Sequence, residues 1–407
     1  MPAFFLGRIV ALLLALGALA GAQDFTQRGF FETNALLFPQ TAPNDGSQAN
    51  GAALFRYEAF YKPRPGLQFA GSLDARADTH EETERSGGVS WWDRERQRPA
   101  LEVRRLSATY TRGKLTLEAG KQFIRWGKAD VLNPTDRFAP RDYLNVVDND
   151  FLGITAARLT YGGQNNSVEV VYSPVLTPSR MPLPDERWSP LPAGIPVMEL
   201  PARFPGGPQL GGRWNHIGRS VEYSLSFYDG HDHLPLFRAQ PARGELQIQP
   251  FYPQMRMYGA DAAAPLPGVT LKGEAAYFTS STPQADQYGL YVLQLERQAG
   301  EWFFVAGYAG QVIERHGEAA GFSPERGFTR AIVARAGYTI DVNRSLAFEA
   351  VVRQNGHGLW LKAEYSQAFG QHWRATAGFA WIHGDASDFL GQFHRNSHGL
   401  LAFRYSF

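Results

Sequence analysis

Apolar and polar residues alternate with a period of two over much of the chain after residue 23. In the segment 269–278, Leu271 and Tyr277 occupy apolar positions, whereas Lys272 and Glu274 lie between them. Successive side chains of a strand point to opposite faces of the sheet. The pattern therefore predicts strands with one apolar and one charged face, and it repeats in the segments 221–227, 346–352 and 359–365.

The links between these segments alternate between short turns and long loops. Short polar, Gly or Pro turns are predicted at 62–66, 112–113, 162–166, 218–219, 265–268, 299–301, 341–344 and 370–371. Longer links fall at 78–100, 127–153, 176–208, 229–253 and 316–327. Short periplasmic turns that alternate with long extracellular loops are typical of bacterial outer-membrane barrels.

Eighteen strands are expected between these links, and an even number closes an antiparallel barrel with both ends on one side. Sixteen is the alternative, because the first strand and the region 209–264 have the least regular pattern. The predicted fold is therefore an all-β transmembrane antiparallel β-barrel. The expected strand centres lie near residues 34, 57, 72, 106, 119, 157, 171, 213, 224, 259, 274, 293, 307, 334, 350, 363, 377 and 402.

The C-terminal strand has apolar side chains at Leu401, Phe403, Tyr405 and the last residue, Phe407, with Arg404 on the other face. This strand resembles the C-terminal strand of bacterial outer-membrane proteins. The resemblance implies that Phe403, Tyr405 and Phe407 form an assembly signal for the barrel-assembly machinery.

The first 22 residues have the features of a secretory signal peptide. Arg8 precedes the apolar stretch Ile9–Ala20, which is shorter than the roughly 20 residues of a membrane-spanning helix, and Ala20-Gly21-Ala22 suits cleavage. We expect residues 23–407 to form a single barrel domain in the outer membrane of a Gram-negative bacterium, in contact with its lipid.

Composition excludes several classes of site. The chain has no Cys, which excludes disulfides and Cys-ligated metals, and its net charge of +1 does not indicate nucleic-acid binding. No nucleophile motif is present, so we expect neither an enzyme nor a cofactor, and the monomeric and trimeric states both stay open. His231-Asp232-His233 is the one metal-like spacing, and surface-loop polarity explains it better than a metal site.

The face opposite the apolar one is rich in charges of both signs and is predicted to line the lumen. Two interpretations stay open: a polar channel whose basic residues attract anions, or a network of cross-strand ion pairs that stiffens the wall. The predicted lumen-lining residues are Arg56, Arg76, Arg158, Arg213, Lys272, Glu274, Arg335, Glu349, Arg353, Lys362, Glu364 and Arg374.

The segment 120–143 is the most distinctive part of the chain. It begins as a strand end and becomes a charged loop, in which Asn133-Pro134 and Pro140 interrupt strand pairing. This loop either folds inward and constricts the pore or lies against the inner wall through its own ion pairs. Its candidate pore residues are Arg125, Lys128, Asp130, Asp136, Arg137, Arg141 and Asp142.

Gly120-Lys-Gln, Arg125-Trp-Gly and Asn133-Pro-Thr-Asp in this segment resemble the porin-like barrels that include alginate-export and phosphate-selective channels. Membership would imply passive conduction of a polar or anionic solute, or an outer-membrane exit for a lipid or polysaccharide. An exit of this kind would have an inner-membrane transporter as its partner. The acidic residues among the basic ones argue against strong anion selectivity.

The sequence thus predicts an outer-membrane channel for a polar, anionic or amphipathic solute. A structural or assembly barrel, closed by its loops and working with partner proteins, is the alternative, and a barrel enzyme is the second alternative. The loop 176–208 contains Trp188 and Phe204 and either covers the mouth or lies on the outer surface. Its apolar content suits lipid-like or aromatic solutes.

Overall fold

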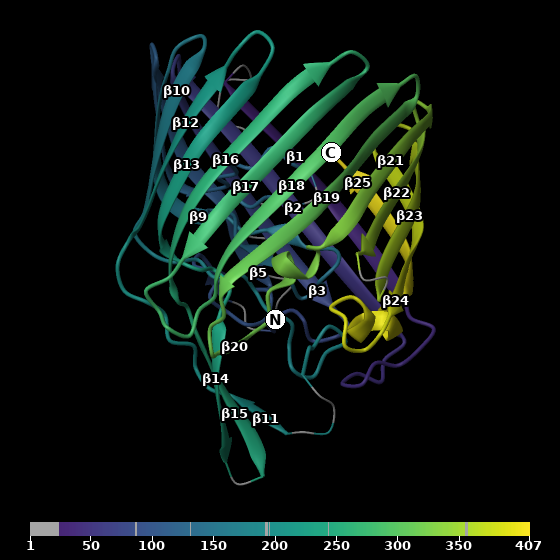
Figure 1. The fold of residues 1–407 in the computed structure, drawn as a ribbon. Coiled ribbons are helices and arrows are strands. Elements are labelled where there is room, and N and C mark those ends of the chain that lie inside the picture. Colours follow the sequence, from purple (N-terminus) through teal and green to yellow (C-terminus); the bar gives the residue numbers. More distant parts are fainter. Residues whose placement is uncertain are drawn as a thin grey trace.

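The computed structural model describes residues 24–85, 88–130, 132–191, 194, 196–242, 244–354 and 357–407. Within these residues, eighteen antiparallel strands form a closed barrel (Figure 1). The predicted signal segment, 1–22, lies outside the described residues. No helix in the described part of the chain is long and apolar enough to cross a membrane.

Each barrel strand pairs with the next one along the chain, and the last strand pairs with the first, with Phe31 opposite Tyr405. All of the expected strand centres lie within these strands, so the count of eighteen is confirmed and sixteen is wrong. The strands are β1 (Phe25–Leu37), β2 (Ala49–Arg64), β3 (Leu67–Asp78), β5 (Leu101–Arg112), β6 (Leu115–Gln122), β9 (Ile154–Gly162), β10 (Asn166–Ser173), β12 (Gln209–Ile217), β13 (Glu222–His231), β16 (Gln254–Leu266), β17 (Val269–Thr279), β18 (Gln287–Ala299), β19 (Trp302–Arg315), β21 (Ala331–Asp341), β22 (Arg344–Arg353), β23 (Gly358–Phe369), β24 (Trp373–Gly384) and β25 (His398–Ser406).

The period-two pattern places apolar side chains on the outer face of the barrel. On β13, Leu225 is 53% exposed on the outside, whereas its neighbours Ser224 and Ser226 are buried inside. Phe379 on β24 and Phe403 on β25 are each 56% exposed. An outer surface of exposed apolar and aromatic side chains is the surface that a barrel presents to lipid.

The short turns gather at one end of the barrel and most long loops at the other (Figure 1). At the short-turn end, Gly66 and Gly268 have φ angles of +80° and +78°, which L side chains rarely adopt. The predicted alternation of short and long links is therefore confirmed. We refer to the two sides as the short-turn end and the long-loop end.

A smaller sheet projects from the long-loop end (Figure 1). It contains β11 (Val197–Glu199), β14 (Leu236–Ala242), β15 (Glu245–Phe251) and β20 (Ala320–Gly321). The long link predicted at 229–253 is present between β13 and β16, and it contains the hairpin of β14 and β15. The remaining short elements are β4 (Val89–Ser90), β7 (Arg141–Asp142), β8 (Asp150–Phe151), α2 (Pro324–Gly327) and the 3₁₀ helix η1 (Gly391–Asn396).

The seam between β1 and β25 depends on a close approach at Gly29. Gly29 and Phe407 exchange two backbone hydrogen bonds of 3.0 Å, and a Cβ on Gly29 would lie 2.6 Å from the Arg56 carbonyl oxygen. We expect Gly29→Ala to destabilise the barrel by about 1–3 kcal/mol through overpacking, seen as a lower unfolding temperature in heat-modifiable electrophoresis. Gly212→Ala is the control, because its added Cβ meets nothing closer than 3.9 Å. Equal unfolding temperatures would contradict the prediction.

Candidate constriction site

The loop between β6 and β9 folds into the barrel and reaches the far wall. We call its described residues, 123–130 and 132–153, the inner loop. It starts from the fifth barrel strand, yet the backbone N–H of Asp130 donates to Gln294 on β18, the twelfth, at 2.9 Å. Asp148 forms an ion pair of 3.3 Å with Lys362 on β23, the sixteenth strand. The inner loop therefore crosses the lumen.

Glu274 on β17 fixes the loop to the wall. One carboxylate oxygen accepts the backbone N–H groups of Lys128 and Ala129, at 2.9 and 3.1 Å. The other accepts the N–H and the hydroxyl of Thr135, at 2.9 and 2.8 Å. Glu274 is only 3% exposed, so four donors satisfy a buried carboxylate without a cation.

The inner loop also has an apolar side that packs against the barrel wall. The Trp126 and Phe138 rings meet edge to face with centroids 5.3 Å apart, and Phe138 meets Tyr228 of β13 at 5.1 Å. Met257 of β16 and Phe278 of β17 belong to the same buried cluster. In this region the inner face of the wall is apolar, whereas the alternation predicted a polar one.

Three of the predicted pore residues are buried in the structure of the loop. Asp136 accepts the backbone N–H of Gly127 at 2.7 Å. Arg137 forms an ion pair of 2.8 Å with Glu325 of α2. Asp142 joins the loops 79–100 and 174–208 to the inner loop through Arg98 and Arg180, at 2.9 and 2.7 Å. All three are 4–5% exposed, which leaves them little contact with a solute.

Glu325, the buried partner of Arg137, is held in its charged form. Burial alone would raise the pKa of Glu325, but Arg137 and His233 outweigh it and bring the pKa well below its ordinary range. His233 lies 3.3 Å from Glu325 and is 2% exposed. Attributing His233 to surface-loop polarity is therefore wrong, because this ring is part of a buried charge cluster.

The other predicted pore residues, Arg125, Lys128, Asp130 and Arg141, are partly accessible. The guanidinium groups of Arg125 and Arg141 each lie 4.1 Å from the centroid of the Phe151 ring. Asp130 pairs with Lys272 at 3.3 Å. No carboxylate among the described residues lies within ion-pair distance of Arg141, whose guanidinium donates to Asn149 at 2.9 Å.

A cavity lies on each side of the inner loop. One of about 300 Å³ lies toward β9, β10, β12 and β13 and is lined by Arg125, Lys128 and Arg213 with Glu169 and Glu222. Another of about 220 Å³ lies toward β21, β22 and β23. Its charged lining consists of Arg141 and Arg335 with Asp130, Asp136, Asp148, Glu325 and Glu349. Charged cavities thus lie in the lumen on both sides of the inner loop.

Nearly all predicted lumen-lining residues make charged contacts in the barrel interior. Arg374 is the exception among them, since it is exposed and donates to the Ser366 hydroxyl at 3.4 Å. Glu274 holds the inner loop, as described above. The others form ion pairs: Arg56 and Arg76 with Asp74, Arg158 with Glu118, Arg213 with Asp261, Lys272 with Glu296, Arg335 with Glu349, Arg353 with Asp388, and Lys362 with Glu364.

The loop after β10 extends over part of the long-loop end. We call its described residues, 174–191, 194 and 196–208, the mouth loop. Arg187 lies 3.8 Å from the centroid of Phe38, which follows β1, and Trp188 lies 5.4 Å from Phe393 of η1. Because β10 is the seventh strand and these partners flank the first and last strands, the mouth loop crosses the opening.

The mouth loop and the small sheet enclose an apolar cavity of about 500 Å³. Phe204 and Tyr252 stack in its wall with centroids 5.3 Å apart, and the Arg94 guanidinium lies 4.3 Å from the Phe204 centroid. Burial lowers the pKa of Arg94. A cavity of this volume and lining is in the range of small-molecule sites.

No protein-family model and no curated protein matches the sequence, but solved structures do match the fold. A BenF-like porin from Pseudomonas fluorescens Pf-5 has a TM-score of 0.57 at 10% identity, over 95% of this chain and 98% of that one. Acinetobacter baumannii OccAB4 has a TM-score of 0.54 at 12% identity, over 95% and 98%. The chain has the fold of an outer-membrane porin. Pseudomonas aeruginosa OpdQ agrees, with a TM-score of 0.53 at 9% identity over 95% and 99%.

These likenesses, at such low identity, concern the porin fold alone. None of the three structures is described as an alginate-export or phosphate-selective channel. The narrower resemblance of the segment 120–143 to that group therefore stays a prediction.

Proposed function

We propose that this porin-fold chain is an outer-membrane channel through which a polar, anionic or amphipathic solute crosses without chemical change. The observation that carries the proposal is the inner loop, which crosses the lumen and has a charged cavity on either side. A loop that narrows a wide barrel in this way leaves room for selective passage and excludes large solutes. The porins among the similar structures support the same function.

The outward-facing apolar side chains support a location in the outer membrane, with the short-turn end in the periplasm. In this proposal, Phe403, Tyr405 and Phe407 act as the assembly signal. Phe403 and Phe407 are 56% and 46% exposed, which leaves their rings accessible on the outside of the barrel.

The chemistry along the path favours a solute with an apolar body and a negative charge. At the long-loop end, the apolar cavity presents the stacked Phe204 and Tyr252 rings together with Arg94. Farther in, Arg141 offers a guanidinium whose charge no described carboxylate neutralises at ion-pair distance. A solute would meet the apolar cavity first and the cation next.

Planar-bilayer recording tests the proposal directly. The refolded chain is expected to insert and give stable unit currents, and a salt gradient then gives a reversal potential that reports the anion preference. A barrel closed by its loops would give no unit current, and this result would refute the channel.

The accessible cations of the inner loop are expected to set the charge preference. A unit charge about 4 Å from an ion contributes about 1 kcal/mol in water, which is about fivefold in relative permeability. Replacing Arg125, Lys128 and Arg141 together by Gln should therefore lower the anion-to-cation permeability ratio by at least about fivefold. Arg85→Gln, on an exposed part of an outer loop, is the control and should leave the ratio unchanged. Equal ratios for both variants would place the conducting path elsewhere.

A further inference from the structure

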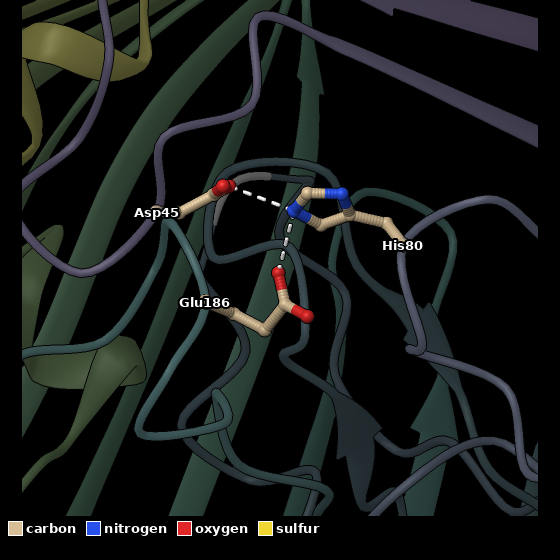
Figure 2. A group of neighbouring side chains, drawn as sticks. All are labelled: Asp45, His80 and Glu186. Atoms are coloured by element: carbon tan, nitrogen blue, oxygen red, sulfur yellow. Dashed lines mark hydrogen bonds and ion pairs between the residues drawn. The ribbon is translucent and has the colours of Figure 1, made fainter.

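Three long loops bring Asp45, His80 and Glu186 together at the long-loop end. Asp45 lies between β1 and β2, His80 follows β3, and Glu186 belongs to the mouth loop. Figure 2 shows both carboxylates directed at the same ring nitrogen of His80. His80 Nε2 is 2.7 Å from Asp45 Oδ2 and 2.9 Å from Glu186 Oε2.

One ring nitrogen cannot satisfy both carboxylates. Nε2 carries at most one proton, and Asp45 has the geometry of its hydrogen-bond partner. Glu186 Oε2 is inaccessible to solvent and has no hydrogen-bond partner. Its side chain is 12% exposed, so an unpaired acceptor is buried at the centre of the cluster.

The surroundings are negative. The carboxyl groups of Glu82, Asp185 and Asp78, together with Asp45, lie close enough to Glu186 to act on it electrostatically. Two arginines lie nearby, but Arg98 is engaged by Glu82 and Asp142. Arg187 donates to backbone carbonyls, and its Nη1 is 3.9 Å from Asp45 Oδ2. Arg187 is thus the one arginine among the described residues within ion-pair distance of these side chains, and its hydrogen bonds go to backbone carbonyls.

We propose that Asp45, His80 and Glu186 bind a divalent transition-metal ion of the Zn²⁺ type. One imidazole nitrogen and two carboxylate oxygens are donors that Zn²⁺ accepts, and water would complete its coordination. Donors that each lie about 2.1 Å from a tetrahedral Zn²⁺ are roughly 3.4 Å apart. The two carboxylate oxygens would therefore move away from His80 Nε2 by roughly 0.5–0.7 Å when the ion binds. The imidazole disfavours Ca²⁺ and Mg²⁺, which select oxygen ligands.

The bound ion would connect the mouth loop to the loops 38–48 and 79–100 through its ligands. Each loop contributes one ligand, so binding opposes the separation of all three loops. Metal bound only by the folded arrangement stabilises that arrangement by mass action.

Calorimetric titration of the refolded, chelator-treated full chain with Zn²⁺ tests the site. We expect one ion per chain. His80→Ala and Glu186→Gln should each weaken binding by about 100-fold or more, because loss of an outer-shell partner alone costs roughly 10- to 100-fold. Asp185→Asn removes the same charge one residue away, from an exposed position, and should retain the wild-type affinity to within a few-fold.

Limited proteolysis of the mouth loop gives a second readout, and heat-modifiable electrophoresis shows that each variant is folded. Zn²⁺ should slow cleavage in the wild type and in Asp185→Asn, but not in Glu186→Gln. Equal Zn²⁺ affinity in folded Glu186→Gln and Asp185→Asn would overturn the proposal, as would failure of the wild type to bind Zn²⁺. Neither readout depends on ion conduction, so the channel proposal is tested separately.

Discussion

Replacement of Glu274 by Ala is expected to raise the single-channel conductance and its fluctuations, because it frees the inner loop from the barrel wall. Glu274 accepts hydrogen bonds from Lys128, Ala129 and Thr135, four in all. A buried donor left without an acceptor costs about 1–3 kcal/mol. Detachment of residues 128–130 and 132–135 from the wall would therefore cost less than leaving the four donors buried without an acceptor. The cavities on the two sides of the inner loop would then join. Planar-bilayer recording measures the effect.

Glu364→Ala is the matched control for Glu274→Ala. Glu364 lies on the inner face of β23, is 28% exposed, and forms one ion pair of 3.3 Å with Lys362. Its removal should change the conductance only slightly. Similar conductance changes in the two variants would show that Glu274 acts through its charge in the lumen and not by fixing the loop.

Glu325→Gln is expected to lower the free energy of unfolding by about 3–5 kcal/mol, because Arg137 would keep its charge in a buried site without a counter-ion. Arg137 is 4% exposed, and Glu325 is its ion-pair partner at 2.8 Å. Urea unfolding in detergent, followed by tryptophan fluorescence, measures the loss. Glu318→Gln changes an exposed acid in the same link and should leave the midpoint in place. Equal midpoints would contradict the role of this ion pair.

The same ion pair predicts a pH dependence. The folded-state pKa of Glu325 is below its ordinary value of 4.5. The group therefore contributes its full stability above about pH 4.5 and loses it as the pH falls through the folded-state pKa. Wild-type stability should decline below this pH, and Glu325→Gln should show a smaller decline.

The strands and the sides of the connections could be predicted because their signals are local. The two faces of β17 are set by local residues alone, because Lys272 and Glu274 alternate with Leu271 and Tyr277. Turn residues such as Gly268 mark the short links for the same reason. The strand count then follows from the connections.

The apolar inner face near the long-loop end was not predicted, because it depends on which loop segments pack against the barrel wall. Phe278 and Trp360 lie at inward positions where a polar residue would be expected, and both are buried. Their one sequence signal is a break in the alternation, as in Leu359-Trp360-Leu361. Such a break does not say which segment covers the side chain.

Which candidate pore residues are buried and which are accessible also could not be predicted without the folded chain. In the sequence, Arg137 and Arg141 are equivalent charges four residues apart, but α2 buries the first and leaves the second accessible. Asp45, His80 and Glu186 come from three different loops, so their spacing along the chain does not predict that they meet. Contacts between distant loops decide both outcomes.

Conduction past the inner loop can be tested by chemical modification during bilayer recording. The chain has no Cys, so Arg141→Cys introduces a single thiol. We expect the unit currents of this variant to fall when a bulky water-soluble thiol reagent is added. They should stay constant in Phe379→Cys, whose side chain is 56% exposed on the outer face. Absence of unit currents, or an unchanged current in modified Arg141→Cys, would contradict conduction past the inner loop.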